Sequence, residues 1–244
     1  FHHMVLRGNS SLISKIIALI SLNRAAHLTS DAIRVYPKLA SEHHAALLAI
    51  SQPLTVAERS LESAMMAELR EVASSLAFGA SVEEITFFDR LLARFTIKYN
   101  ATINRFYQHL PEWRNLSQLP TEQYLVAEKG ALAQITNPWR DGYLHLVYNP
   151  MGKVLAGIAN PAYASYPRRI IDADGLLRLV SLQIQIAAQE IPESDIPAFL
   201  KNADPQFRDP YTGQPMQWDK TRGLYFRGYS DRITDKDGFV SVKL

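Results

Sequence analysis

The sequence predicts a mainly α-helical protein whose smaller C-terminal α+β segment contains an antiparallel hairpin. Apolar residues recur at helical spacing throughout the first 136 residues. Beyond that point turn-forming pairs become frequent, among them Asn137-Pro138 and Asp174-Gly175. A proline turn followed by an apolar strand stands at residues 209–218, and residues 223–226 supply a return strand.

The N-terminal part is expected to be a bundle of amphipathic helices. Helical spacing covers residues 12–22, 24–36, 38–50, 55–78, 81–110 and 121–135. The segments 55–58 and 81–84 have capping-box spacing, in which a Thr or Ser accepts from a later amide and a Glu reaches back. Pro37 and Pro111 are expected to end two helices because proline lacks the amide donor.

The C-terminal part combines short elements with turns. The expected elements are a strand at 143–148, helices at 152–159 and 176–190, a hairpin at 214–227 and a polar tail. An isolated two-stranded hairpin is barely stable in water. We therefore expect it to pack through Trp218 and Phe226 on the apolar face of helix 176–190.

The chain divides into three parts on this basis. Residues 1–4, Phe-His-His-Met, are interpreted as a tag remnant and set aside for fold and metal arguments. Residues 5–136 form the helical bundle region, and residues 137–244 form the α+β region. The two regions are expected to pack together as one unit.

The composition indicates which cellular compartment and which classes of partner are compatible with the chain. The 244 residues carry a net charge of +2, which argues against a nucleic-acid partner, and contain no cysteine. Lack of cysteine is common where thiols are oxidised, so it favours a periplasmic or extracytoplasmic bacterial protein, with chance as the alternative. The apolar stretch 12–22 is shorter than the roughly 20 residues of a membrane span. We expect membrane attachment only through an anchor that precedes these residues.

The sequence predicts no metal site and no cofactor. His43-His44 are adjacent, so on a helix they point about 100° apart and cannot both face one ion easily. The segment 172–175 begins like a calcium loop but lacks the later glycine and glutamate, and is interpreted as a turn. The segment 235–238 is interpreted as a solvated turn, with a cation site as the alternative. No nucleophile-elbow, phosphate-loop or dinucleotide motif is present.

Aromatic and basic residues gather in the irregular region and are the candidate binding residues. They are Trp139, Arg140, Tyr163, Tyr166, Arg168 and Arg169. These residue types are enriched at interfaces, which suggests a surface for a partner or an anionic ligand. The alternative is that the tyrosines pack and the arginines pair with Asp172 and Asp174.

The C-terminal part resembles proteins of the bacterial envelope. A helix at 176–183, the segment Asp-Pro-Tyr-Thr-Gly-Gln-Pro-Met-Gln-Trp at 209–218 and Leu-Tyr-Phe at 224–226 are similar to the end of membrane-anchored proteins of unassigned function. The order is also similar to the tail of type II secretion major pseudopilins. The resemblance covers about residues 176–230 and implies a local architecture and a compartment. The helical N-terminal part has no pseudopilin counterpart.

The leading functional hypothesis is a non-enzymatic interaction or accessory domain of an envelope protein, with another envelope protein as its partner. The alternative is a hydrolase or sugar-acting enzyme whose catalytic residues are dispersed in the sequence. A deep polar pocket with converging carboxylates or histidines would favour the enzyme. A groove or an exposed apolar patch would favour the binding domain.

Overall fold

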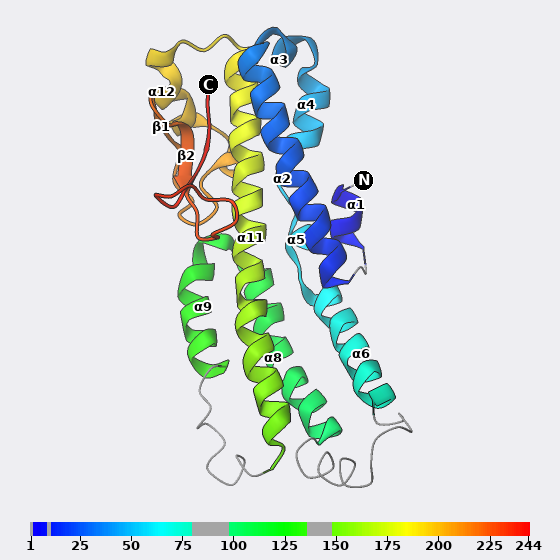
Figure 1. Ribbon diagram of the computed structural model, residues 1–244. Helices are drawn as coiled ribbons and strands as arrows, with labels where there is room; N and C mark the ends of the chain where they lie inside the picture. The colour runs from blue at the N-terminus through cyan, green and yellow to red at the C-terminus, as the bar shows by residue number, and fades with distance from the viewer. Residues whose placement is uncertain (1, 9–10, 80–97, 136–147) are drawn as a thin grey trace.

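The computed structural model describes residues 2–8, 11–79, 98–135 and 148–244, and it confirms the mainly helical fold with a small antiparallel sheet (Figure 1). Its helices are α1 (His2–Arg7), α2 (Leu12–Val35), α3 (Lys38–Glu42), α4 (His44–Ser51), α5 (Val56–Arg59), α6 (Glu62–Gly79), α8 (Tyr99–Gln118), α9 (Thr121–Ile135), α11 (Pro150–Ala188) and α12 (Ile196–Asn202). Its strands are β1 (Gln217–Asp219), β2 (Gly223–Arg227) and β3 (Phe239–Val242).

The long helix α11 is the centre of the molecule. Figure 1 shows it running along the whole length, with α8 and α9 beside its first half and α2 and the sheet beside its second. Every side chain from Ile170 to Leu177 is buried. Burial on all faces of a helix means that other elements surround it. The core of the protein therefore lies around the second half of α11.

The continuity of α11 corrects two predicted turns. Asn149 adopts a left-handed conformation with φ 62°, and Pro150 then occupies the first turn, where proline is tolerated. The helix continues through Asp174-Gly175, which was predicted to be a turn, and through Asn160-Pro161, another of the turn-forming pairs beyond residue 136. At Asp174 a tertiary contact outweighs local preference: the buried carboxylate accepts from the amide of Leu54 at 2.6 Å. It also accepts from Arg178, one turn further along the same helix, at 2.7 Å.

The N-terminal helices agree with the predictions in part. The helix at 121–135 is confirmed, as is the start of α2, where the Ser11 hydroxyl accepts from the amide of Ser14. Asn23 does not interrupt α2. The predicted helix 38–50 is broken at His43 into α3 and α4.

Two further helix boundaries were predicted wrongly. The capping box at Thr55 and Glu58 is confirmed, but it opens only the short helix α5, because the chain leaves the helix at Ser60 before α6 begins. Pro111 lies inside α8 and does not end it. The predicted capping box at 81–84, the helix between it and residue 97, and most of the strand at 143–148 lie outside the described residues.

The hairpin packs on α11 as predicted, mainly through Phe226. Strand β2 pairs with β1 on one side and with β3 on the other, both antiparallel. The predicted polar tail is wrong here: Val240 and Val242 are buried, so residues 239–242 add a third strand. Phe226 is fully buried against Gly175, while Trp218 is half-buried at the edge of the core.

The N-terminal residues that the sequence analysis set aside take part in the fold. Helix α1 packs on α2 and α5 and buries Leu6. His3 and Arg7 both contact Glu58, at 3.0 and 2.9 Å. Within the described ranges, none of the helices has both the length and the apolar content that crossing a membrane requires.

Candidate functional site

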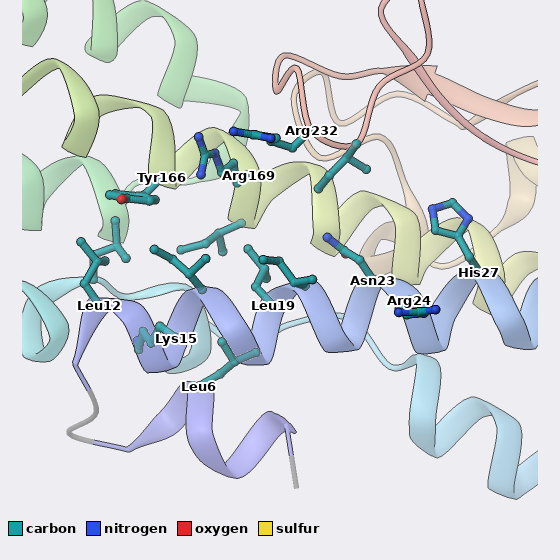
Figure 2. A pocket seen from close by; sticks show the side chains of 15 residues that line it. Leu6, Leu12, Lys15, Leu19, Asn23, Arg24, His27, Tyr166, Arg169 and Arg232 are labelled. Carbon is teal, nitrogen blue, oxygen red and sulfur yellow. The ribbon is translucent and has the colours of Figure 1, made fainter.

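A cavity of about 660 Å³ lies between α2 and α11, and we call it the α2–α11 groove (Figure 2). Its size falls in the range of roughly 300–1,000 Å³ that is usual for ligand pockets. Its lining residues are Leu6, Leu12, Lys15, Ile16, Leu19, Ile20, Asn23, Arg24, His27, Leu61, Tyr166, Arg169, Ile170, Arg232 and Ile233. None of these fifteen described residues carries a carboxylate.

Helix α2 gives the groove an apolar end and a polar end. Its lining residues recur every three or four positions, which places them on one face of the helix. Leu12, Ile16 and Leu19 come from the first half of this face, whereas Asn23 and His27 come from the second half. The polarity of the groove therefore changes along the helix axis.

The opposite wall carries two arginines. One turn of α11 supplies Tyr166, Arg169 and Ile170, and the loop after β2 supplies Arg232 and Ile233. Arg169 is half-buried, and its guanidinium carbon lies 5.3 Å from the centre of the Tyr166 ring. Figure 2 labels both Arg169 and Arg232 among the side chains that line the groove. Among the residues that the structure describes, neither arginine forms an ion pair.

Asp172 fixes the loop that carries Arg232. Its buried carboxylate accepts from the Tyr211 hydroxyl at 2.7 Å and from the amides of Tyr229 and Ser230 at 3.0 and 2.6 Å. Burial raises the pKa of Asp172 to about 6, although these hydrogen bonds act in the opposite direction. Asp172 lies one helical turn beyond Arg169. The same part of α11 therefore carries Arg169 and, through Asp172, positions the loop that carries Arg232.

Lys15 lines the apolar end but is already engaged. Its side chain is buried, and its ammonium donates to the carbonyl of Ser60. Burial lowers the pKa of Lys15 to about 8, while the negative charge of Glu58 raises it. The hydrogen bond to Ser60 stabilises the non-helical connection between α5 and α6, so Lys15 has a structural role.

The polar end contains a buried acceptor that has no hydrogen-bond partner among the described residues. This atom is Oδ1 of Asn23. Figure 2 shows the other end of the amide, the nitrogen, pointing into the groove. His27 lies one turn further along α2, and burial lowers its pKa while Asp31 opposes that shift. An imidazole and an amide therefore accompany Arg24 at this end.

The structure separates the residues that the sequence grouped as binding candidates. Tyr166 and Arg169 line the groove. Arg168 faces α9 instead, where it forms a bidentate ion pair with the buried Glu128 at 2.7 and 2.8 Å. Tyr163 lies in α11, and Trp139 and Arg140 lie outside the described residues.

The alternative pairing of these arginines with Asp172 and Asp174 is not what the structure shows. The partner of Arg168 is Glu128, and Asp174 pairs with Arg178 at 2.7 Å. The acidic segment near the C-terminus forms a turn, in which Asp235 accepts from the amides of Asp237 and Phe239. In the parts of the chain that the structure describes, no group of three or more histidines and carboxylates is arranged to hold a metal ion.

Sequence reasoning missed the α2 side of the groove and the loop side. The signal on α2 was visible, because one face is apolar up to residue 20 and polar from residue 23. No local signal marks Arg232, since only the fold brings its loop to α11. Comparisons with protein-family models, with curated proteins and with solved structures return no match for this chain.

Proposed function

We propose that this chain is a non-enzymatic interaction domain of the bacterial envelope and that it binds its ligand in the α2–α11 groove. One observation carries the proposal: a mainly apolar groove is lined by three arginines, Arg24, Arg169 and Arg232, and none of them forms an ion pair with the described residues. Apolar ligand surface gains about 25 cal/mol for each Å² removed from water. Cations beside that surface attract a negatively charged group and give the binding its selectivity.

The charge of the lining supports binding rather than hydrolysis. A hydrolase would need carboxylates or histidines that converge on one point. The described lining contains one histidine and no carboxylate. Buried carboxylates elsewhere are held by structural partners: Glu58 by Arg7 and Thr55, and Glu128 by Arg168.

The outer side of α2 supports an interaction role as well. It exposes a row of large apolar side chains beside the groove, namely Ile13, Ile17, Ile20, Leu28 and Val35. Exposed apolar side chains grouped on one side of a helix are typical of a docking face. The envelope location and an envelope partner are part of the proposal, and they are supported by the lack of cysteine and by the C-terminal resemblance.

Binding of the apolar anionic dye anilinonaphthalene sulfonate tests the proposal. Ile20 lines the groove and is 61% exposed, while Ile13 is equally exposed on the same helix and does not line it. Ile20→Glu places a negative charge on the lining, so we expect the dye affinity to fall by about tenfold or more, the size of one charged interaction. Ile13→Glu is the matched control and should leave the affinity unchanged.

Dye fluorescence measured at rising dye concentration gives both affinities. An equal loss of dye affinity in the two variants would show that the dye binds the outer face of α2, and it would refute binding in the groove. Absence of saturable binding to the parent protein would refute the binding function itself.

A further inference from the structure

We infer that the ligand of the α2–α11 groove is a single-chain amphiphile with an anionic head group, of the fatty-acid type. This inference rests on the proposed function and names its ligand class. It follows from three features of the groove: the change of polarity along α2, the arginines in the opposite wall, and the mainly apolar lining toward α1 and the start of α6.

The groove is elongated and changes polarity once. From Leu12 to Asn23 the lining face of α2 rises by about 16 Å, at 1.5 Å for each residue. The facing wall on α11 is only one helical turn, from Tyr166 to Ile170. A cavity lined along this length by one face of α2 can hold one extended chain.

The head-group site lies among Arg169, Arg232 and Asn23. Guanidinium groups donate paired hydrogen bonds to a carboxylate, and a nearby amide nitrogen can add a third donor. Because Arg169 and Arg232 both line the groove, their positive charges both attract a bound anion. Stacking against Tyr166 keeps the Arg169 guanidinium in the wall at 5.3 Å from the ring centre.

The tail site lies toward α1 and the start of α6. Leu6, Leu12 and Leu61 form this end and are each at most 3% exposed. Ile16 and Ile170 continue the apolar surface toward the arginines. A hydrocarbon chain would gain the full benefit of burial here because it has no polar atom to desolvate.

The apolar end disfavours an acidic peptide as the occupant. A peptide backbone brings an N–H and a C=O with each residue, and each needs a partner when buried. Of the polar side chains at this end, Lys15 already donates to Ser60. Tyr166 is the other, and it lies beside Arg169. An acyl chain makes no such demand.

The test compares dansyl-labelled undecanoic acid with its methyl ester, which has the same tail and no charge. We expect the parent protein to bind the acid about tenfold or more tightly than the ester, as for a hydrogen bond to a charged group. Arg169→Gln with Arg232→Gln should remove this preference while retaining affinity for the ester. Arg227→Gln, at an exposed arginine on β2 outside the groove, is the control and should keep the preference.

Several outcomes would overturn the ligand class. Equal binding of acid and ester, a preference that survives in the double variant, or binding only to phosphatidylglycerol vesicles would each do so. Continued binding of anilinonaphthalene sulfonate in those cases would leave the proposed function standing. Should the double variant unfold, Arg232→Glu alone replaces it, because Arg232 is exposed and does not form part of the core. Retained preference for the acid would then refute the head-group site.

Discussion

At the scale of single residues, buried carboxylates decide how distant segments meet. Asp172 joins α11 to Tyr211 and to the amides of Tyr229 and Ser230. Asp174, two positions later, accepts hydrogen bonds from the amide of Leu54 and from the side chain of Arg178. Neither carboxylate lines the groove, yet Asp172 positions the loop that carries Arg232.

The raised pKa of Asp172 makes one part of the stability depend on pH. The folded state holds the proton up to about pH 6, whereas the unfolded chain releases it near pH 3.8. The extra stability of the protonated form is therefore fully present below about pH 4 and is lost as the pH rises through about 6. Between about pH 5 and about pH 7 this group should lower the free energy of unfolding by about 1 kcal/mol.

Urea unfolding of the parent and of Asp172→Asn at both pH values measures this effect. The asparagine does not titrate, so the difference between the two proteins should change by about 1 kcal/mol between the two pH values. A difference that is independent of pH would show that Asp172 is ionised throughout this range.

At the scale of elements, α9 and the sheet attach to α11 by different means. One ion pair, between the half-buried Arg168 and the buried Glu128, attaches α9 to the central helix, and Tyr124 adds a hydrogen bond to the same carboxylate at 2.9 Å. The sheet is held by close packing of Phe226 over Gly175. Each attachment gives a separate test.

Arg168→Met leaves Glu128 buried without its counter-charge. Removing one partner of a buried pair costs about 3–5 kcal/mol, and we expect a loss of that order in the free energy of unfolding. Adding Glu128→Gln removes the stranded charge and should restore much of the loss. Arg34→Met is the control, because its partner Asp31 is exposed and such pairs contribute only about 0–1 kcal/mol. Equal costs for Arg168→Met and Arg34→Met in urea unfolding would contradict the buried role of Glu128.

Gly175→Ala should destabilise the protein, although alanine is the better helix former. A Cβ at this position would lie 2.2 Å from the Phe226 ring, and overpacking of a core costs about 1–3 kcal/mol. Gly130→Ala in α9 is the matched control: its Cβ would meet nothing within 4 Å, so the change should stabilise by up to about 1 kcal/mol. Thermal melting of both variants measures the two effects. A raised melting temperature for Gly175→Ala would mean that Phe226 does not pack against this glycine.

At the scale of the whole molecule, local patterns predicted elements better than they predicted their assembly. The start of α2, the whole of α9 and the β1–β2 hairpin follow from capping, periodicity and turn chemistry. The single helix α11 does not, because Asp174-Gly175 has the local preference of a turn. Contacts with Leu54 and Phe226, far away in the sequence, override that preference.

The groove escaped prediction for the same reason. The sequence indicated Tyr166 and Arg169, but their neighbours in space come from α1, α2 and the loop after β2. It also grouped Arg168 with Arg169, although adjacent residues on a helix point about 100° apart. Arg168 faces α9, and Arg169 faces the groove.

That divergence of two neighbouring arginines gives the molecule a form of linkage. Because Arg168 and Arg169 share one turn of a continuous helix, a ligand that rotated this turn as it bound Arg169 would also move Arg168 relative to Glu128. Occupancy of the groove and attachment of α9 would then share a coupling free energy. By thermodynamic reciprocity, whatever tightens or loosens α9 changes ligand affinity by the same factor with which the ligand changes α9. Helix α9 would thereby be an effector element for a site that it does not touch.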